Sequence, residues 1–191
     1  MQLPSFYLFL YMIWYFTPYG IDKDLGKAYN QYAKLVTDKD DWICFLDADT
    51  CIGLVPKFGH VLQEIVDLYP DTGLFTSYAS RIGNKQQRFA GKISEDPNIL
   101  NHKKIAKSQV HHYKTRVKEL NKIISGHLMM VKKSTWDAIG GAPEGIGILS
   151  IDNWISKRIL RSGKNILLME GIYLFHFYRL DTGKQDKSHL L

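Results

Sequence analysis

The sequence predicts an α/β fold: a central, mostly parallel sheet with helices on both faces, built as one domain over residues 1–191. Short apolar runs of strand length alternate along the chain with segments whose apolar residues recur at helical spacing. Such alternation is typical of parallel sheets. The composition, with 45% hydrophobic and 23% charged residues, is that of an ordinary globular domain that can bury a core without disulfides.

Each expected element has its own local signal. The strands are apolar runs that end at turn residues, and they are expected at 7–16, 42–46, 73–78, 128–131 and 166–177. The helices are expected from Leu25 to Val36, from Pro56 to Leu68, from Ser134 to the Gly140-Gly141 pair, and over 151–161. In such sheets ligands bind beyond the carboxyl ends of the strands, so the residues that follow each apolar run are the candidate site.

The amino-terminal segment admits two interpretations. Residues 3–16 carry no charge and are rich in Tyr, Phe and Trp, which favours a buried central strand. A membrane or interfacial anchor is the alternative, but about 14 apolar residues are fewer than the roughly 20 that a spanning helix needs. No basic region and no small-residue cleavage site mark a signal peptide. Cys44 and Cys51 are too few for a disulfide framework, so a cytoplasmic protein is expected.

Positive charge is concentrated in one polar segment, at about 82–122. Between Arg81 and Lys122 there are 11 Lys and Arg residues against three acids, an excess of +8 in a chain whose net charge is +6. The segment is expected to be a flexible excursion with some helix. It is either a solvated face or a surface for phosphates, nucleic acid or a membrane. A non-catalytic nucleic-acid-binding module is disfavoured, because Phe89 and Tyr113 are its only aromatic residues.

The stretch at 43–52, ICFLDADTCI, ends an apolar run with two carboxylates one residue apart. Asp47 and Asp49 repel each other and keep their charge only beside a cation, several donors or water. A polar turn is the plain interpretation. The stretch also resembles the first motif of haloacid-dehalogenase-type phosphatases, in which Asp47 would attack phosphorus. Those phosphohydrolases need a later strand that ends in paired acids, and the only adjacent acids after residue 71, Glu95 and Asp96, follow no such strand.

A third interpretation uses more of the chain. Its motifs, in order, are Leu25-Gly26-Lys27-Ala28-Tyr29-Asn30, Asp47-Ala48-Asp49-Thr50, Ser125-Gly126-His127, Gly140-Gly141, Ile151-Asp152-Asn153-Trp154 and His176-Phe177-Tyr178-Arg179. Together they resemble family 2 glycosyltransferases with the GT-A fold, a Rossmann-like three-layer sandwich, over residues 16–179 apart from the basic segment. The resemblance implies a hexosyltransferase that moves a sugar from a nucleotide diphosphate sugar to an acceptor hydroxyl with inversion.

The resemblance also implies a metal and a base. Mn²⁺ or Mg²⁺ would neutralise the leaving diphosphate as a Lewis acid. Asp49 would be a direct ligand, Asp47 would contact the metal shell or the ribose, and His176 would be the distal metal-binding histidine. Asp152 would take the proton of the acceptor hydroxyl. The structural alternatives are a helix N-cap for Asp152 and a structural histidine for His176.

The donor site is expected in the front half of the chain. By resemblance its nucleotide-binding residues, besides Asp47, are Thr17, Pro18, Tyr19, Gly26 and Asn30. This half is shorter than in the family, because 27 residues separate Tyr19 from Asp47; Asp22 or Asp24 would have to replace the acid that reads the base. The expected partners are a nucleotide-sugar donor and a glycan or lipid-linked acceptor, with peripheral membrane contact through the basic segment and no nucleic acid.

Overall fold

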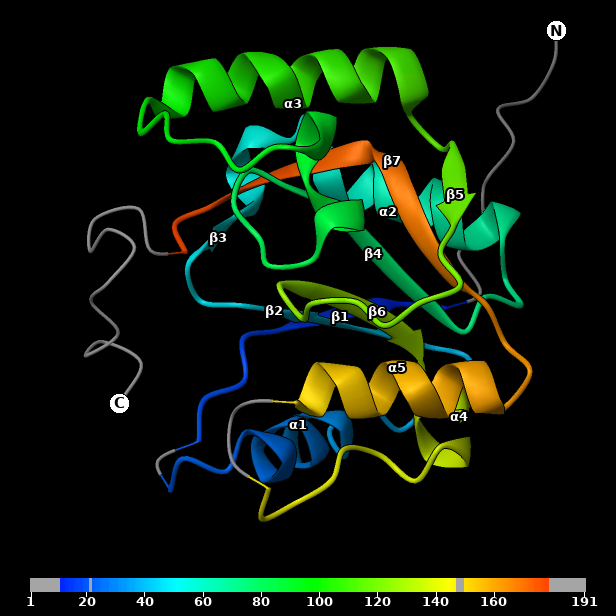
Figure 1. Ribbon diagram of the computed structural model, residues 1–191. Coiled ribbons are helices and arrows are strands. Elements are labelled where there is room, and N and C mark those ends of the chain that lie inside the picture. Colours follow the sequence, from blue (N-terminus) through cyan, green and yellow to red (C-terminus); the bar gives the residue numbers. More distant parts are fainter. Residues whose placement is uncertain (1–10, 21, 147–149, 179–191) are drawn as a thin grey trace, which may run out of the picture.

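The computed structural model describes residues 11–20, 22–146 and 150–178. They form an α/β fold in three layers, with a sheet between helices on both faces (Figure 1). The helices are α1 (Leu25–Ala33), α2 (Phe58–Leu68), α3 (Ile99–Tyr113), α4 (Lys133–Ala138) and α5 (Ile151–Arg161). The strands are β1 (Ile13–Phe16), β2 (Trp42–Leu46), β3 (Thr50–Cys51), β4 (Leu74–Ala79), β5 (Val117–Glu119), β6 (Leu128–Lys132) and β7 (Ile166–His176). Helices α2 and α3 cover one face of the sheet, and α1, α4 and α5 cover the other.

The sheet is mixed, and the expectation of a mostly parallel sheet is wrong. Its strands are hydrogen-bonded in the order β1-β2-β6-β4-β7-β3, and β5 pairs with β7 beside this path. The pairs β1–β2 and β4–β7 are parallel, whereas β6 is antiparallel to both of its neighbours. The cause is the 80–127 segment, which returns the chain to the edge where β2 ends, so that Leu46 pairs with Leu128. The hydrophobic pattern of a strand is the same whichever way the strand runs, so the sequence does not reveal that β6 is antiparallel to its neighbours.

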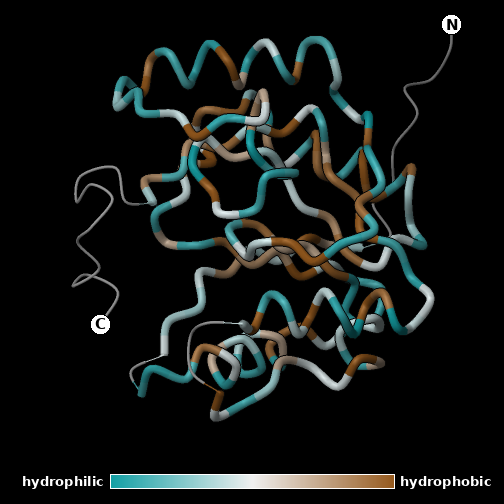
Figure 2. The backbone as a smooth tube through the Cα atoms, in the orientation of Figure 1, coloured by the Kyte–Doolittle hydropathy of each residue, from teal (hydrophilic) through white to brown (hydrophobic). Residues whose placement is uncertain are grey.

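Two apolar cores lie on the two faces of the sheet. Alternate residues of β2 supply both, because successive side chains of a strand point to opposite faces: Ile43 and Phe45 join α1, α4 and α5, whereas Trp42 and Cys44 join α2 and α3. Figure 2 shows the hydrophobic residues along the sheet and the hydrophilic ones mainly on the outer helices and loops. The buried sheet fixes the strand ends, and therefore the polar residues that follow them.

The amino-terminal strand lies at the edge of the sheet, not at its centre. Of the expected run at 7–16, residues 7–10 lie outside the described part. β1 pairs with β2 alone, and Trp14 and Tyr15 are 36% and 40% exposed. The indole N–H of Trp14 donates to the carboxylate of Asp41 at 2.8 Å. Aromatic residues favour edge and central strands alike, so composition alone did not distinguish the two.

The basic segment is more ordered than an excursion. It contains two 3-10 turns (Lys85–Gln87 and Phe89–Gly91), α3 and β5. Helix α3 packs on β7 through His102, whose ring stacks on Phe175 at 4.1 Å between centroids and whose Nδ1 lies 2.6 Å from the hydroxyl of Tyr173. The outward side of α3 carries exposed lysines, at 103, 104 and 107. The segment therefore covers the sheet on its inner side and presents charge on its outer side.

Candidate metal centre

Asp47 and Asp49 follow β2 in a turn whose backbone is hydrogen-bonded to residues beside the ends of β6 and β7. The backbone N–H of Asp47 donates to the carbonyl of His127 at 3.1 Å, and Thr50 N–H closes the turn on the carbonyl of Asp47 at 3.1 Å. The next two residues form β3, in which Thr50 pairs with His176 of β7. Phe177 N–H donates to the carbonyl of Asp49 at 3.0 Å. This pairing brings the aspartates to the far end of β7.

The side chains of Asp47, Asp49 and His176 meet at one point. Nε2 of His176 lies 3.0 Å from Oδ1 of Asp49 and 3.8 Å from Oδ2 of Asp47. One ligand atom from each of the three residues lies within 4.8 Å of the other two. Nδ1 of His176 is 2.7 Å from the carbonyl oxygen of Arg81. Because a carbonyl only accepts, Nδ1 carries the proton, and Nε2 is the nitrogen that faces the aspartates.

The charges of His176 and Asp49 depend on each other. Burial opposes the charged form of both groups. Burial is the largest single influence, but the hydrogen bond between them, their opposite charges and backbone hydrogen bonds together exceed it, so the pKa of His176 is raised and the pKa of Asp49 is lowered from their ordinary values. With both ring nitrogens facing oxygen acceptors, the surroundings favour the protonated imidazolium. Its positive charge offsets the repulsion between the two adjacent carboxylates.

Of the two carboxylates, Asp47 is the one whose charged form is disfavoured by its surroundings. Loss of solvation raises its pKa to about 6, helped by the negative charges of Asp49 and Asp152 and opposed by His176. The side chain of Asp47 is 42% exposed, so one face of the carboxylate is open to a ligand. A bound cation would remove the repulsion that keeps this pKa high.

The donor set fits a divalent metal ion. Carboxylate oxygens are the ligands that Mg²⁺ and Mn²⁺ prefer, and a neutral imidazole suits Mn²⁺ as well. The carbonyl of Arg81 fixes the ring orientation and the tautomer of His176, as the partners of metal-bound histidines do. The three residues could therefore hold a metal ion with Nε2 of His176 and one oxygen of each aspartate.

A cavity of about 400 Å³ opens beside this group and also contains Asp152. Gly126 lies at its wall, where a Cβ would stand 3.3 Å from Cβ of Asp152. The Asp152 carboxylate accepts the backbone N–H of Asn153 at 2.8 Å and is also bonded by the backbone of Gly126. Burial nevertheless raises the pKa of Asp152 above its ordinary value. Ser150, with φ of 88°, is the N-cap of α5, so Asp152 is not the cap residue.

Sequence reasoning missed a buried polar network beneath the centre. His127 is fully buried and stacks on the ring of His176 with 5.8 Å between centroids. Its Nε2 lies 3.0 Å from the hydroxyl of Ser77. The amide of Gln87 binds the backbone of Ser125 on both sides, accepting its N–H at 2.7 Å and donating to its carbonyl at 3.0 Å. The Ser-Gly-His motif was a signal for His127, but nothing in the sequence marks Gln87.

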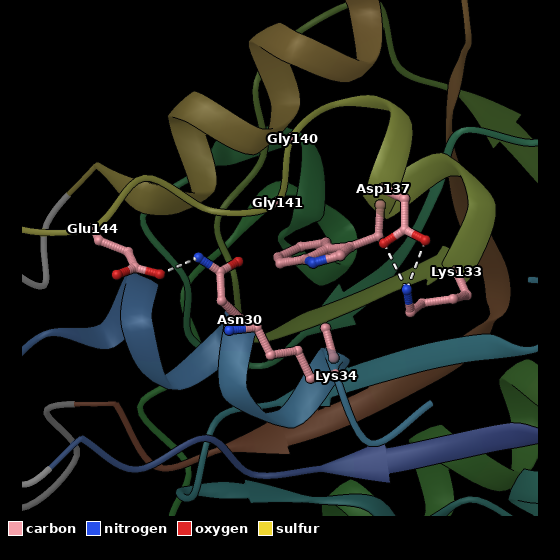
Figure 3. Close-up of a pocket in the computed structure, with 9 residues that line it drawn as sticks. Asn30, Lys34, Lys133, Asp137, Gly140, Gly141 and Glu144 are labelled. Atoms are coloured by element: carbon pink, nitrogen blue, oxygen red, sulfur yellow. Dashed lines mark hydrogen bonds and ion pairs between the residues drawn. The ribbon is translucent and has the colours of Figure 1, made fainter. Parts of the chain in front are cut away.

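Two residues predicted to bind the donor nucleotide, Gly26 and Asn30, contact the 142–144 loop and do not line this cavity. A Cβ at Gly26 would stand 1.8 Å from the carbonyl oxygen of Pro143, so the glycine allows α1 to contact that loop. Asn30 accepts the N–H of Ala142 at 2.9 Å and donates to its carbonyl at 2.9 Å and to Glu144 at 2.8 Å. Figure 3 shows Asn30 at the wall of a separate pocket beside Gly141 and Glu144.

The other residues predicted in the front half of the chain do not line the cavity either. Thr17, Pro18 and Tyr19 follow β1, and Tyr19 is 78% exposed. Asp24 caps α1 by accepting the N–H of Lys27 at 3.1 Å. Asp22 pairs with the Lys27 ammonium at 3.0 Å. In the described residues, α1 contributes to the cavity through Leu25 and Tyr29.

Comparisons with known proteins do not assign the chain to a family. A scan against models of protein families and a search of curated proteins give no match. Within the described residues, every helix is too short or too polar to cross a membrane. The function must therefore be argued from the site itself.

Proposed function

We propose that the chain is a metal-dependent glycosyltransferase of the GT-A type, similar to family 2, that transfers a sugar from a nucleotide diphosphate donor to an acceptor hydroxyl. One observation carries the proposal: Asp47, Asp49 and His176 converge on one point, and Asp152 lies in the same cavity. These are the residues to which the sequence resemblance gives the metal and base roles. The three-layer α/β architecture, with the aspartates at the end of β2, supports the same assignment.

The proposed reaction has two requirements: neutralisation of the leaving diphosphate and removal of the acceptor proton. A divalent cation held by Asp47, Asp49 and His176 would neutralise the negative charge that develops on the leaving diphosphate. The Arg81 carbonyl keeps Nε2 of His176 directed at that position. A bound cation would displace any proton held by Asp47 or His176, because ligand atoms must be deprotonated.

Asp152 is suited to take the acceptor proton. Burial brings the pKa of Asp152 closer to neutral pH than the pKa of an ordinary aspartate. A pKa nearer to the working pH makes a more effective general base. The backbone bonds from Asn153 and Gly126 fix one side of the carboxylate. When the acceptor oxygen forms its bond to the anomeric carbon, Asp152 accepts the hydroxyl proton and the nucleotide diphosphate departs from the opposite face, with inversion.

The acceptor proposed is a glycan or a lipid-linked sugar, and the outer side of α3 is the proposed contact with an anionic membrane. The lysines at 103, 104 and 107 are exposed, and α3 contains no acidic residue. Such a face attracts anionic headgroups at about 1 kcal/mol per basic residue close to the surface. The proposed location is accordingly the cytoplasm, at or near a membrane surface.

The test is a thermal-unfolding panel of UDP-, GDP-, ADP- and dTDP-sugars, with and without Mn²⁺. A ligand at 100 times its Kd stabilises the folded state by about 2.7 kcal/mol, which is readily detected. We expect at least one nucleotide sugar to stabilise the protein only when Mn²⁺ is present. Stabilisation by none of them, at millimolar concentration with metal, would refute the proposal.

A further inference from the structure

Another cavity, of about 220 Å³, lies on the α3 side of the sheet. Three aromatic rings and three polar groups line it: Tyr78, Phe89, Tyr113, Gln109, Arg116 and Glu170. They come from β4, the second 3-10 turn, α3, the residues before β5, and β7. Figure 1 shows the carboxyl end of α3 leading into β5, which runs beside β7. The fold thus brings distant parts of the chain together around one space.

An irregularity of β7 places Glu170 at this cavity. The register with β4 passes from Ser77 opposite Met169 to Tyr78 opposite Tyr173, so residues 170–172 bulge from the ladder. Bulges redirect side chains and are common next to functional sites. Glu170 forms an ion pair with Arg116, whose guanidinium lies 4.2 Å above the ring of Tyr113. A carboxylate and a guanidinium are therefore held side by side at the rim.

Gln109 offers the cavity a polar group without a partner. The residue is only 8% exposed, and its side-chain amide makes no hydrogen bond to any residue that the structure describes. The amide is not among the fully enclosed polar atoms that lack a partner, and the residue lines the cavity. Buried amides are almost always hydrogen-bonded. A ligand oxygen in this cavity would satisfy the donor and acceptor that the protein leaves open.

Backbone strain marks the same place. Ala90, which lines the cavity, has φ of 51° inside the second 3-10 turn. A residue with a side chain adopts this left-handed conformation only where the surrounding contacts offset its strain. The preceding residue, Phe89, also lines the cavity, and its ring meets Tyr78 edge-on at 80° between planes. The strained turn therefore carries one of the aromatic walls of the cavity.

We propose that this cavity binds one pyranose ring of a glycan and serves as an acceptor subsite of the proposed glycosyltransferase. A sugar ring combines apolar C–H faces, which suit aromatic walls, with hydroxyls that both donate and accept. An amide, a carboxylate and a guanidinium provide the matching partners. A flat nucleobase fits less well, because the Tyr78 and Phe89 rings are nearly perpendicular and Arg116 already covers Tyr113.

The position of the cavity relative to the metal centre suits an extended acceptor. Ile82 and Gly83 line the cavity of Asp152, and Phe89 and Ala90 line this one, so a single loop borders both. Along β7, Glu170, which lines this cavity, is six residues from His176, or at most about 20 Å in an extended strand. An oligosaccharide of several rings covers such a distance. The subsite would hold one ring while another presents its hydroxyl to Asp152.

The experiment is an NMR titration of the isotope-labelled full chain with the methyl glycosides of glucose, galactose, mannose and N-acetylglucosamine. No metal and no nucleotide are added, so the result does not depend on the donor site. We expect at least one glycoside to bind at millimolar Kd and to shift the side-chain amide signal of Gln109. The Asp49→Ala protein should bind the same glycoside equally well, which separates failure of the donor site from failure of this subsite.

Variants decide whether the observed binding uses this cavity. Gln109→Leu removes the amide at similar volume and should raise the Kd about three- to tenfold, the loss expected for a neutral hydrogen bond. Ser108→Ala, at the exposed neighbouring position, is the matched control and should leave the Kd unchanged. Glu170→Gln, at the rim, provides a second test should the leucine variant unfold. The proposal is overturned if none of the four glycosides binds below 20 mM, or if binding leaves the Gln109 amide signal unmoved.

Discussion

His176 and Asp49 are 127 positions apart in the chain, and yet Nε2 of the histidine lies 3.0 Å from Oδ1 of the aspartate. Two residues of β3 produce this contact by pairing with the last residues of β7. The ligand set is therefore assembled by the sheet and not by a local motif. Metal binding should report whether these strand ends have met, because the unfolded chain keeps no such arrangement.

Asp49→Ala should abolish the stabilisation that Mn²⁺ and a nucleotide diphosphate give together, and leave the apo protein folded. The variant removes a metal ligand and the partner that raises the pKa of His176. Thermal unfolding with and without the two ligands is the measurement. Asp71→Ala, which removes an exposed acid at the opposite end of β4, is the control. Full metal-dependent stabilisation of Asp49→Ala would remove this residue from the site.

The affinity for Mn²⁺ should fall as the pH is lowered from 8 to 5.5. In the metal-free protein the pKa of Asp47 is about 6 and the pKa of His176 is raised above its ordinary value of 6.5. Below these pKa values protons occupy the ligand atoms, and each displaced proton lowers the affinity about tenfold per pH unit. Calorimetry in buffers of different ionisation enthalpy should detect proton release on binding. A constant affinity and no proton release would contradict the assigned ligands.

The free energy of unfolding of the metal-free protein should depend on pH through His127. Burial lowers the pKa of His127 to about 3, whereas the unfolded chain binds this proton near pH 6.5. Below pH 6.5 the unfolded state therefore holds more protons at this site, and stability falls as the pH falls, by at most about 1.4 kcal/mol per pH unit.

Urea unfolding at pH 7.5 and 5.0, in the presence of a chelator, isolates this effect when the protein is compared with His127→Gln. The variant should lose less stability than the original protein between these two pH values, whatever its stability at pH 7.5. His60→Gln, at an exposed histidine, should keep the original pH dependence. An identical pH dependence in His127→Gln would show that His127 is not held neutral by the fold.

The sequence predicted the elements better than their arrangement. The limits of β2 and α5 agree with the predicted ranges, because turn residues and periodicity act locally. The direction of β6 and the edge position of β1 were predicted wrongly, because the hydrophobic pattern of a strand does not depend on its direction or on the number of its neighbours.

The candidate site shows the same division. The aspartates and His176 follow apolar runs, so their positions at the sheet edge could be predicted. The roles of Gly26 and Asn30 could not, because the contact of each with the 142–144 loop depends on tertiary packing. Gln87 lies in a polar segment and resembles its exposed neighbours until the fold buries it completely.

Asp152→Asn should lower turnover about 10²- to 10⁴-fold, the usual cost of losing a general base, while the affinity for the donor survives. The substitution keeps the size of the side chain and removes its ability to accept a proton. Turnover and donor affinity are measured with the nucleotide sugar that stabilises the protein best. Transfer at the original rate would exclude Asp152 as the base.

Asp47→Asn distinguishes the transferase from a phosphohydrolase. In the transferase the variant should lose metal-dependent donor binding, and metal-free stability should hold or rise because a carboxylate beside two other acids is neutralised. In a phosphohydrolase, Asp47 would be the nucleophile, and Asp152→Asn would matter much less. Mass spectrometry of the protein during turnover is the measurement. A phosphorylated Asp47 would overturn the transferase proposal.

Replacing Lys103, Lys104 and Lys107 with Gln should weaken binding to vesicles that contain anionic lipid and leave nucleotide affinity nearly unchanged. The three lysines lie on the exposed side of α3, and attraction to such a surface decays within about 10 Å at 0.1 M salt. Co-sedimentation with vesicles at two salt concentrations measures it. Gln at 34, 39 and 157, three exposed lysines elsewhere, is the control of equal charge. Equal loss of vesicle binding in both variants would assign the effect to net charge.

The reversed strand β6 also determines when the protein can fold during synthesis. β2 and β4 do not pair with each other in the sheet, and β6, which lies between them, follows β4 by nearly 50 residues. β7, which supplies His176, follows later still. A nascent chain that ends before residue 128 exposes both strands with no shared neighbour, a state prone to pairing with other chains. Folding of the sheet, and with it the assembly of the metal ligands, is therefore expected only after β6 and β7 have been synthesised.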